Sequence, residues 1–293
     1  MDIVLEAQAP FSLPAVVRSH GWVQLAPFSS SDPYHDFRYV DRLQSGRVVT
    51  WDVQPCDGGA LLSVGGELSS AEQRETEDKA RWVLGLDQDL APFYDVARQE
   101  PRLAKVVENA AGRILRSPTL FEDTVKTILT TNTAWIGTIR MVRSLVDLYG
   151  EPSPEDPSRR AFPTPERLAG ADVEALRKEA RLGYRAPYVH ALADRVARGD
   201  LDLEALKTAD LPTGELRKEL LALKGVGAYA AANLLMLLGR TDFIPIDSYA
   251  LKMVSKEFHG GEPVGPQEVE AAFARWGEWN GMAYWFWEWS GNG

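Results

Sequence analysis

Two glycines and one aspartate in the last third of the chain are the residues whose types and spacing could do chemistry. Gly225 and Gly227 lie in "LKGVGAYAAANLLMLLG", between two segments with a helical pattern, and Asp247 follows in "FIPIDSYALKMV". Glycine permits positive φ and a close approach to the backbone. Free N–H groups at a helix start can hold a phosphate oxygen without a basic side chain. The two motifs can therefore combine a phosphate-binding turn with a functional carboxylate.

Both motifs also have a purely structural interpretation. Glycines make tight helix–helix turns, and short glycine patterns occur by chance. An aspartate directly before a helix is a favoured N-cap. The flank "FIPI", however, places Asp247 near apolar surface, where a charge is costly without a partner or a task. A carboxylate in such a place can stabilise a developing positive charge or activate water.

The elements that must position these residues change in type along the chain. "GRVVTWDVQP" alternates like a half-buried strand, "CDGG" gives a turn, and "ALLSV" reads as the returning strand. A helix follows in "SSAEQRETEDKARWVLGL", with Ser70 and Gln73 at capping-box spacing. The sequence predicts an α+β fold that is mostly α. It has a small β-rich N-terminal domain at 1–95 and a two-lobed helical domain at 96–293.

Helical signals dominate the second part. Pro101 suits a first helical turn, and "RLAKVVENAAGRIL" after it reads as helix. Residues 150–165 hold five prolines and predict an exposed loop. Apolar periodicity predicts further helices after Ser117, from Trp135, at about 172–181, 185–198, 248–258 and 266–276, and a helix-hairpin-helix at about 214–239.

Composition limits the class of protein. Of 293 residues, 45% are hydrophobic and 25% are charged, which is ordinary for a globular protein. No apolar stretch reaches the roughly 18 residues of a membrane span, and "MDIVLEAQAP" lacks the basic flank of a secretion signal. The single Cys56 excludes a disulfide framework and a four-cysteine iron–sulfur cluster, and four scattered histidines offer no metal site. We expect a cytoplasmic protein.

The charge distribution argues in two directions. A formal net charge of −10 is unfavourable for binding nucleic acid, because phosphate contacts favour basic proteins. The charge is uneven, however: acidic residues outnumber basic ones in residues 1–100, and the reverse holds in 101–143. A local basic face can therefore exist inside an acidic chain.

Taken together, the motifs resemble the helix-hairpin-helix base-excision DNA glycosylases. A helix, "LKGVG", a small-residue helix and then an aspartate in "IPID" follow that family's order. "ILRSPTLFEDTVKTILTTNTAW" is similar to the family's helix before the lesion-probing loop, and "LGYRAPYV" to a segment of 8-oxoguanine glycosylases. "RWGEWNGMAYWFW" resembles the end of bacterial 3-methyladenine glycosylase II. The resemblance covers roughly residues 100–290 and, more loosely, the β-rich N-terminal part.

The resemblance implies that the hairpin binds the DNA backbone and that Asp247 is catalytic. By position the hairpin comprises Leu223, Gly225, Val226 and Gly227. In the family it often binds a monovalent cation, Na⁺ or K⁺, and no other cofactor is required. Bifunctional members carry a nucleophilic lysine two residues after "GVG"; here Tyr229 holds that position, and Lys224 and Lys252 lie elsewhere. The resemblance therefore implies a monofunctional enzyme without lyase activity.

Further site residues follow from resemblance and residue type. The base pocket is expected to contain Tyr229, Trp135 and Trp287, although tryptophans near the end of a chain, Trp285 included, are often core residues. Asn132 resembles the residue that fills the gap left by a flipped base, with a helix C-cap as its alternative. Tyr184 and Arg185 resemble a wedge and a contact to the orphaned base. The alternative for Arg185 is a phosphate contact or a solvated charge, and His190 reads as structural.

The predicted function is removal of a damaged base, an alkylated purine, from double-stranded DNA. One alternative is a glycosylase for oxidised purines such as 8-oxoguanine, which "LGYRAPYV" suggests. Another is a non-catalytic DNA-binding module, which would have no use for Asp247 beside the sugar. We expect a monomer with no membrane association, located in the cytoplasm and with the nucleoid if the protein is bacterial.

Overall fold

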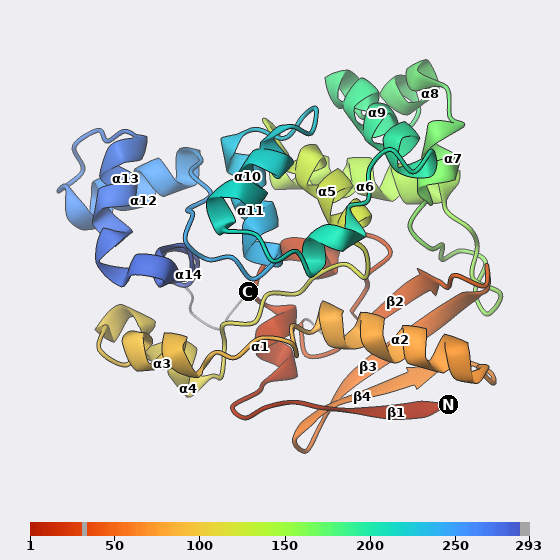
Figure 1. The fold of residues 1–293 in the computed structure, drawn as a ribbon, viewed down its shortest axis with the longest axis horizontal. Helices are drawn as coiled ribbons and strands as arrows, with labels where there is room; N and C mark the ends of the chain where they lie inside the picture. Colours follow the sequence, from red (N-terminus) through yellow and green to blue (C-terminus); the bar gives the residue numbers. More distant parts are fainter. Residues whose placement is uncertain (31–33, 288–293) are drawn as a thin grey trace.

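The computed structural model describes residues 1–30 and 34–287, and the chain opens with a small antiparallel sheet (Figure 1). The strands pair in the order β1-β4-β3-β2. Their bounds are β1 (Asp2–Glu6), β2 (Phe37–Arg42), β3 (Val48–Cys56) and β4 (Gly59–Val64). The last two strands form the predicted hairpin, with Cys56 opposite Gly59 and a left-handed Gly58 (φ +75°) in the turn. Val49, Trp51 and Val53 are buried, so the alternation predicted for β3 is confirmed.

Helix α2 (Ser70–Val83) contacts β1, and its cap lies one residue earlier than predicted. The Ser69 hydroxyl accepts a hydrogen bond from the Glu72 N–H, and the Glu72 carboxylate accepts one from the Ser69 N–H at 2.9 Å. The predicted pair, Ser70 and Gln73, is wrong. A carboxylate at the third helical position also interacts favourably with the positive end of the helix dipole, which a glutamine amide does less well.

Helices make up most of the remaining described chain, as predicted. Among the described residues, no helix is long and apolar enough to cross a bilayer. The helices and short 3₁₀ turns (η) are α1 (Leu13–Val17), η1 (Gly21–Gln24), α3 (Ala91–Ala97), η2 (Pro101–Leu103), α4 (Ala104–Glu108), α5 (Leu120–Thr130), α6 (Trp135–Tyr149), α7 (Pro165–Ala169), α8 (Val173–Lys178), η3 (Gly183–Arg185), α9 (Ala186–Ala197), η4 (Glu204–Lys207), α10 (Thr213–Leu221), α11 (Ala228–Leu237), α12 (Ser248–Phe258), α13 (Pro266–Phe273), η5 (Ala274–Trp279) and α14 (Asn280–Trp285).

The helix predicted after Pro101 is shorter than expected. Helix α4 ends at Glu108, and the next turn is closed by bonds from Ala110 N–H to the Val107 carbonyl and from Ala111 N–H to the Val106 carbonyl. This pattern ends a helix with a residue in the left-handed region, and Ala110 has φ +52°. The chain then runs without helix as far as α5.

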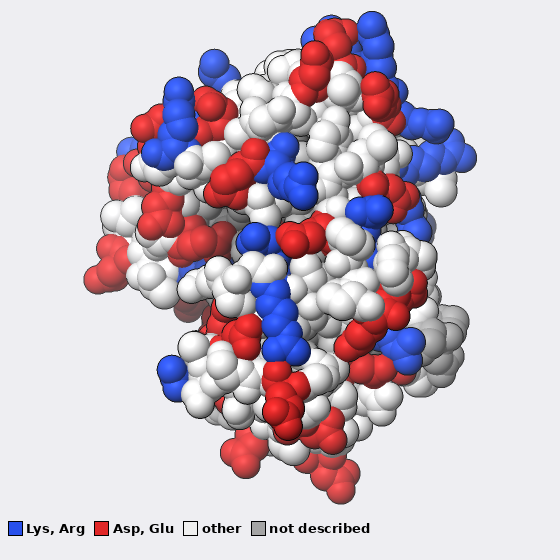
Figure 2. Space-filling view, turned by 90° about the vertical axis from the view of Figure 1, so that its right-hand side faces the viewer, with Lys and Arg blue, Asp and Glu red and all other residues white. Residues whose placement is uncertain are grey.

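Three of the basic residues in 101–143 are buried and therefore cannot form part of a basic surface. Arg113, Arg116 and Lys126 are at most 2% exposed. Arg116 pairs with Asp87 at 2.8 Å, and Lys126 pairs with a neighbouring carboxylate inside the core. On the face shown in Figure 2, Lys and Arg side chains lie among Asp and Glu. For these three cations the expected surface role is wrong, because Lys126 neutralises the buried Glu122, Arg116 pairs with Asp87, and Arg113 donates to backbone carbonyls.

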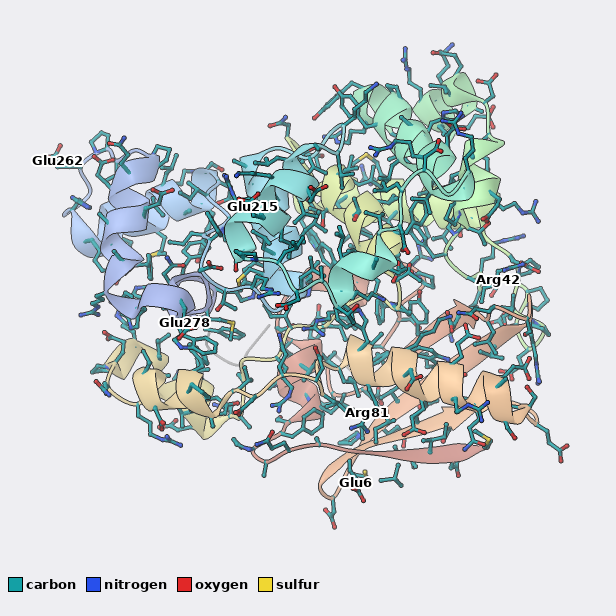
Figure 3. All side chains as sticks on the ribbon, in the orientation of Figure 1. Glu6, Arg42, Arg81, Glu215, Glu262 and Glu278 are labelled. Carbon is teal, nitrogen blue, oxygen red and sulfur yellow. The ribbon has the colours of Figure 1, made fainter. Side chains whose placement is uncertain are left out.

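Sheet and helices share one core. A single buried apolar cluster includes residues from Ile3 in β1 to Trp287 after α14. At the edge of the sheet, Arg42 of β2 donates to Glu151, beyond α6, at 2.7 Å, whereas Glu6 and Glu262 lie on outer edges of the molecule (Figure 3). Residue 95 lies within α3, and the core continues across this position, so two separate domains remain a prediction.

Candidate active site

Helices α10 and α11 form the predicted hairpin, and the two glycines in its turn serve different purposes. Gly225 has φ +89°, and a Cβ there would lie 2.9 Å from the side chain of Tyr188. Gly227 has φ −94°, precedes α11 without a side-chain cap, and a Cβ there would meet no atom within 4 Å. Leu223 and Val226 are buried beside them. Gly225 is therefore needed by the turn itself, whereas Gly227 keeps the start of α11 open.

Asp247 is both a helix cap and part of a cavity wall. Its Oδ1 accepts hydrogen bonds from the N–H groups of Tyr249 and Ala250, both at 2.9 Å. Ile244 and Pro245 before it are buried, but Asp247 itself is exposed. The expected desolvation by the apolar flank is therefore wrong, because the helix start directs this residue into open space. The cap bonds use Oδ1 and leave Oδ2 to other partners.

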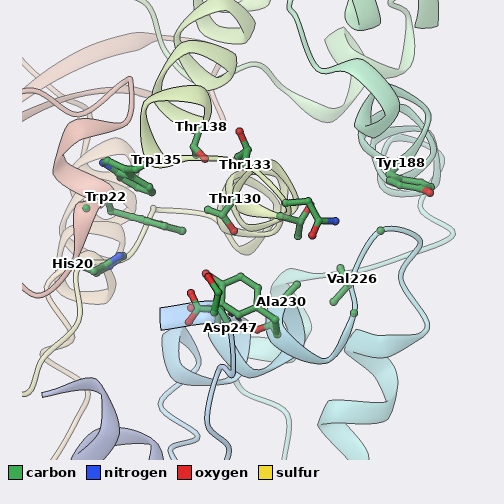
Figure 4. A pocket seen from close by; sticks show the side chains of 18 of the residues that line it. His20, Trp22, Thr130, Thr133, Trp135, Thr138, Tyr188, Val226, Ala230 and Asp247 are labelled. Atoms are coloured by element: carbon green, nitrogen blue, oxygen red, sulfur yellow. Dashed lines mark hydrogen bonds between the residues drawn. The ribbon is translucent and has the colours of Figure 1, made fainter. Parts of the chain in front are cut away.

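A cavity of about 910 Å³ joins the hairpin and Asp247 to three other regions of the chain (Figure 4). A second cavity of about 350 Å³ shares Tyr229, Asn233, Asp247 and Trp285 with it, so Asp247 lies where the two meet. The other regions contribute His20, Gly21 and Trp22 from the N-terminal part, Thr130–Thr133 and Trp135 between α5 and α6, and Tyr184 and Tyr188 near the start of α9.

Asp247 contributes a negative charge to the described lining of the larger cavity. No lysine or arginine is among the described residues that line it. Burial raises the pKa of Tyr229, and the negative charge of Asp247 raises it further; the pKa of Tyr284 is raised by the same two causes in the same order. Both phenols therefore stay protonated at neutral pH. An anionic wall next to neutral aromatic rings favours a cationic guest over an anionic one.

The predicted pocket aromatics occupy different environments. Tyr229 and Trp135 line the larger cavity, and the Trp135 Nε1 donates to Gln24 at 2.8 Å. Trp287 borders the smaller cavity but is only 6% exposed. Its ring centroid lies 5.3 Å from those of Phe258, Phe273 and Trp276. Trp287 is therefore mainly a core residue, whereas Trp285 borders both cavities.

Two of the predicted wedge residues meet at the cavity. The Asn132 Nδ2 donates to the Tyr184 hydroxyl at 3.2 Å, and Tyr184 is 50% exposed. Asn132 has φ +48° and follows Thr131, the C-cap of α5, so the predicted alternative of a C-cap is displaced by one residue. Asparagine tolerates the left-handed conformation better than most residues, which explains its presence there.

Arg185 lies behind this pair. It is 6% exposed, faces the Tyr184 ring at 4.4 Å, and donates to the carbonyls of Thr131 and Asn132. It is absent from the described lining of the cavity. The alternative of a solvated charge is wrong, because the guanidinium is buried and holds the loop. Contact with an orphaned base remains a prediction.

Sequence reasoning did not predict the N-terminal wall of the cavity, His20 and Trp22. The His20 Nε2 donates to the Leu115 carbonyl at 2.6 Å, and burial lowers the pKa of His20 to about 4. The Trp22 ring stacks near that of Trp135, with centroids 6.4 Å apart and planes at 16°. The available signal, "SHGW" outside any periodic segment, is too weak to identify a site.

A buried polar network supports this wall. The Trp22 Nε1 donates to Asp123 Oδ1 at 2.7 Å, and burial raises the pKa of Asp123 to about 6. Glu122, the residue before Asp123 in α5, accepts a hydrogen bond from the Tyr39 hydroxyl at 2.6 Å and forms an ion pair with Lys126 at 2.6 Å. The network joins β2, the N-terminal segment and α5, so the sheet helps to shape the cavity.

A glycine turn between two helices, followed by a capping aspartate at a shared cavity, defines a helix-hairpin-helix protein. The family model described as "HhH-GPD superfamily base excision DNA repair protein" matches residues 125–278, more than half of the chain. The chain belongs to this superfamily.

Several characterised proteins are similar to it. DNA-3-methyladenine glycosylase of Bacillus subtilis is 27% identical over 187 residues, which is 61% of each protein. DNA-3-methyladenine glycosylase 2 of Escherichia coli is 29% identical over 191 residues, covering 61% of this chain and 64% of the relative. The chain thus matches less than two thirds of these relatives. The fold agrees with 3-methyladenine DNA-glycosylase from Archaeoglobus fulgidus, at TM-score 0.75 and 21% identity over 98% of this chain and 97% of that one.

Proposed function

We propose that the protein is a monofunctional DNA glycosylase that releases alkylated purines from double-stranded DNA. The observation that carries the proposal is the cavity itself: Asp247, the hairpin turn and several aromatic rings line one space, with no lysine or arginine among its described lining. The names of the two bacterial relatives support the same substrate class. The cytoplasm, where DNA is reached without crossing a membrane, is the proposed location, and a monomer is the proposed state.

The hairpin would hold the DNA backbone. Gly227 leaves the start of α11 open, so the first N–H groups of the helix can donate to a phosphate oxygen. This requires no basic side chain and suits a chain with a net charge of −10. A monovalent cation would be held at the same turn by backbone carbonyl oxygens between Leu223 and Gly227, since such ions take oxygen ligands. The bound ion would supply positive charge next to the phosphate.

Asp247 would act on the sugar. The target nucleotide leaves the base stack and enters the cavity, because its glycosidic bond is otherwise out of reach. The C1′–N bond breaks with its electron pair moving to the base, and the sugar gains oxocarbenium character. Asp247 Oδ2 offsets that charge and orients a water, whose oxygen bonds to C1′ while its proton passes to solvent. A cationic alkylated base leaves as a neutral molecule and needs no acid.

The proposed absence of lyase activity rests on the position after the hairpin. A lyase needs an amine nucleophile placed against the sugar and activated there. Tyr229 occupies that position with its pKa raised, so its hydroxyl remains protonated. Lys224 and Lys252 are exposed and lie outside the described lining of the cavity. Hydrolysis without strand cleavage is therefore the expected chemistry.

A second candidate substrate is an oxidised purine. Tyr184 and Arg185 belong to "LGYRAPYV", the segment similar to 8-oxoguanine glycosylases, and Tyr184 lines the cavity. A neutral oxidised base is a poorer leaving group than a cationic one and gains less from the anionic wall. The alkylated purine is therefore preferred.

Base release from defined duplexes tests the proposal. Duplexes carrying 3-methyladenine, 1,N6-ethenoadenine, hypoxanthine or 8-oxoguanine are incubated with the wild type and with Asp247→Asn. Release of alkylated purine by the wild type alone, without strand cleavage before alkali, is the expected result. Release of only 8-oxoguanine would favour the second candidate. Binding by both proteins with no release from any duplex would favour a non-catalytic module.

A further inference from the structure

His20 is fixed in the wall of the cavity that Asp247 also lines (Figure 4). Its ring packs at 4.5 Å from Trp22 and meets Trp285 edge-on at 5.8 Å, measured between centroids. Ser19, its neighbour in the chain, accepts from Leu115 N–H through its hydroxyl and from Trp285 Nε1 through its carbonyl. The imidazole is therefore held from several sides, so its orientation is set before any ligand arrives.

The hydrogen bond to Leu115 decides which nitrogen carries the proton. A carbonyl oxygen only accepts, so the Nε2 that lies 2.6 Å from it must be the donor. Burial lowers the pKa of His20 to about 4, so the ring carries one proton at neutral pH. Nδ1 is then an acceptor, and among the described residues no hydrogen bond reaches it.

Among the described residues of this wall, no other side chain competes for the same role. The neighbouring Trp22 and Trp285 side chains can only donate, and both N–H groups are already used, by Asp123 and by the Ser19 carbonyl. Nδ1 of His20 is therefore the side-chain acceptor that this wall offers to a base stacked among its aromatic rings. A neutral acceptor also avoids the repulsion that a cationic histidine would exert on a cationic base.

We propose that His20 is a specificity-determining residue whose Nδ1 accepts a hydrogen bond from the exocyclic 6-amino group of the flipped purine. The inference rests on the proposed function and deepens it. A 6-amino purine such as 3-methyladenine satisfies Nδ1, whereas a 6-oxo purine presents a second acceptor to it and leaves both unpaired. Leaving polar groups unpaired in a site built for a hydrogen bond is a strong source of discrimination.

Two cationic bases that differ at position 6 provide the test. Wild type, His20→Phe, His20→Leu and His20→Gln are compared for release of 3-methyladenine and 7-methylguanine from the same methylated duplex DNA under single-turnover conditions. His20→Phe keeps an aromatic ring, and His20→Leu is a second variant without an acceptor. His20→Gln keeps a donor for Leu115 together with an acceptor. Release of 7-methylguanine by the same sample shows that each variant is folded.

We expect His20→Phe and His20→Leu to release 3-methyladenine at least about tenfold more slowly. Release of 7-methylguanine should be unchanged or faster, because the acceptor that faces its O6 is gone. His20→Gln should keep the ratio of the two rates near that of the wild type. An equal fall for both bases, or an unchanged ratio in the variants without an acceptor, overturns the role of His20 alone. No release of either base by the wild type overturns the proposed function, and the inference with it.

Discussion

The two walls of the cavity are built in different ways. The hairpin and Asp247 lie within one stretch of sequence, residues 223–247, and are shaped by a glycine turn and a helix cap. His20 and Trp22 are held by Leu115 and Asp123, at separations of 95 and 101 positions along the chain. A local motif needs only its own residues to be recognised, whereas the second wall exists only once distant segments have packed.

The walls also differ in chemistry. The helical wall contributes a charged carboxylate and open backbone N–H groups, which suit a sugar and a phosphate. The N-terminal wall contributes aromatic faces and one neutral acceptor, which suit a base. On the proposed function, the first wall determines whether the reaction occurs, and the second determines which base reacts.

The largest expected effect is on the helical wall. Asp247→Asn should lower single-turnover base release about a thousandfold, equivalent to about 4 kcal/mol, because the charge opposite the sugar is lost. Stability should change little, since asparagine also caps a helix. Asp172→Asn at the cap of α8 is the matched control and should leave the rate unchanged. Equal rates for Asp247→Asn and the wild type would contradict a catalytic role for the carboxylate.

Next in size is the support of the N-terminal wall. Lys126→Met leaves Glu122 buried without its ion-pair partner and should cost about 3–4 kcal/mol in the free energy of unfolding, measured in urea. Lys178→Met removes a similar i,i+4 pair, with Glu174, from a side chain that is 75% exposed, and should cost less than about 0.5 kcal/mol. Similar losses in the two variants would contradict the role given to the network.

The pH dependence of stability separates two residues of the same wall. The pKa of His20 is about 4 in the folded protein and ordinarily 6.5, so lowering the pH through this window favours the unfolded state. In the wild type this protonation should lower the free energy of unfolding by no more than about 3 kcal/mol between pH 6.5 and 4, and by less where solvent in the cavity screens the charge. His20→Gln should abolish this pH-dependent loss of stability.

Asp123 should act in the opposite direction. Its pKa is about 6 when folded and ordinarily 3.8, so the folded state binds the proton more strongly, and acid favours folding in this window. Asp123→Asn should therefore steepen the loss of stability on acidification, and His20→Gln should flatten it. Urea unfolding at several pH values measures both slopes, and slopes that move together would contradict the assignment.

The smallest effects distinguish the two hairpin glycines. Gly225→Ala should cost about 1–2 kcal/mol of stability, because φ is +89° and Tyr188 lies against the added carbon. Gly227→Ala should cost only a few tenths of a kcal/mol but weaken binding to duplex DNA about tenfold, since its Cβ would occupy the phosphate site. Each variant is the control for the other. Unchanged DNA affinity in Gly227→Ala would contradict a phosphate-binding site at the start of α11.

The sequence predicted features that depend on neighbouring residues. The β3–β4 hairpin follows from alternation and a turn, and the helical hairpin follows from glycines between two apolar periods. The cap of α2 was missed by one residue because Ser69 and Ser70 both fit the pattern, and only the reach of Glu72 decides between them. The helix after Pro101 was overextended because no propensity rule anticipates Ala110 in a left-handed conformation.

The site was predictable to the same extent. Asp247 and the hairpin lie together as their motif implies, but the exposure of Asp247 could not be read from its apolar flank. Arg185 was predicted to contact an orphaned base or, as the alternative, a phosphate or solvent, and its burial depends on the Thr131 and Asn132 carbonyls of the α5–α6 loop. His20 carries no local signal, because its tautomer and its orientation depend on contacts with residues far along the chain, such as the Leu115 carbonyl that accepts from its Nε2.

The buried Arg185 has a consequence for how quickly DNA could be searched. Its guanidinium fastens the carbonyls of Thr131 and Asn132, and the Asn132 side chain is held by Tyr184. If the loop of Thr131 and Asn132 probes base pairs, as the sequence predicts, its existing order means that little conformational entropy is lost at each base pair. Most of the energy of each inspection would then go into opening the duplex. The protein would then dissociate rapidly from undamaged base pairs, and a base pair weakened by damage would open more readily.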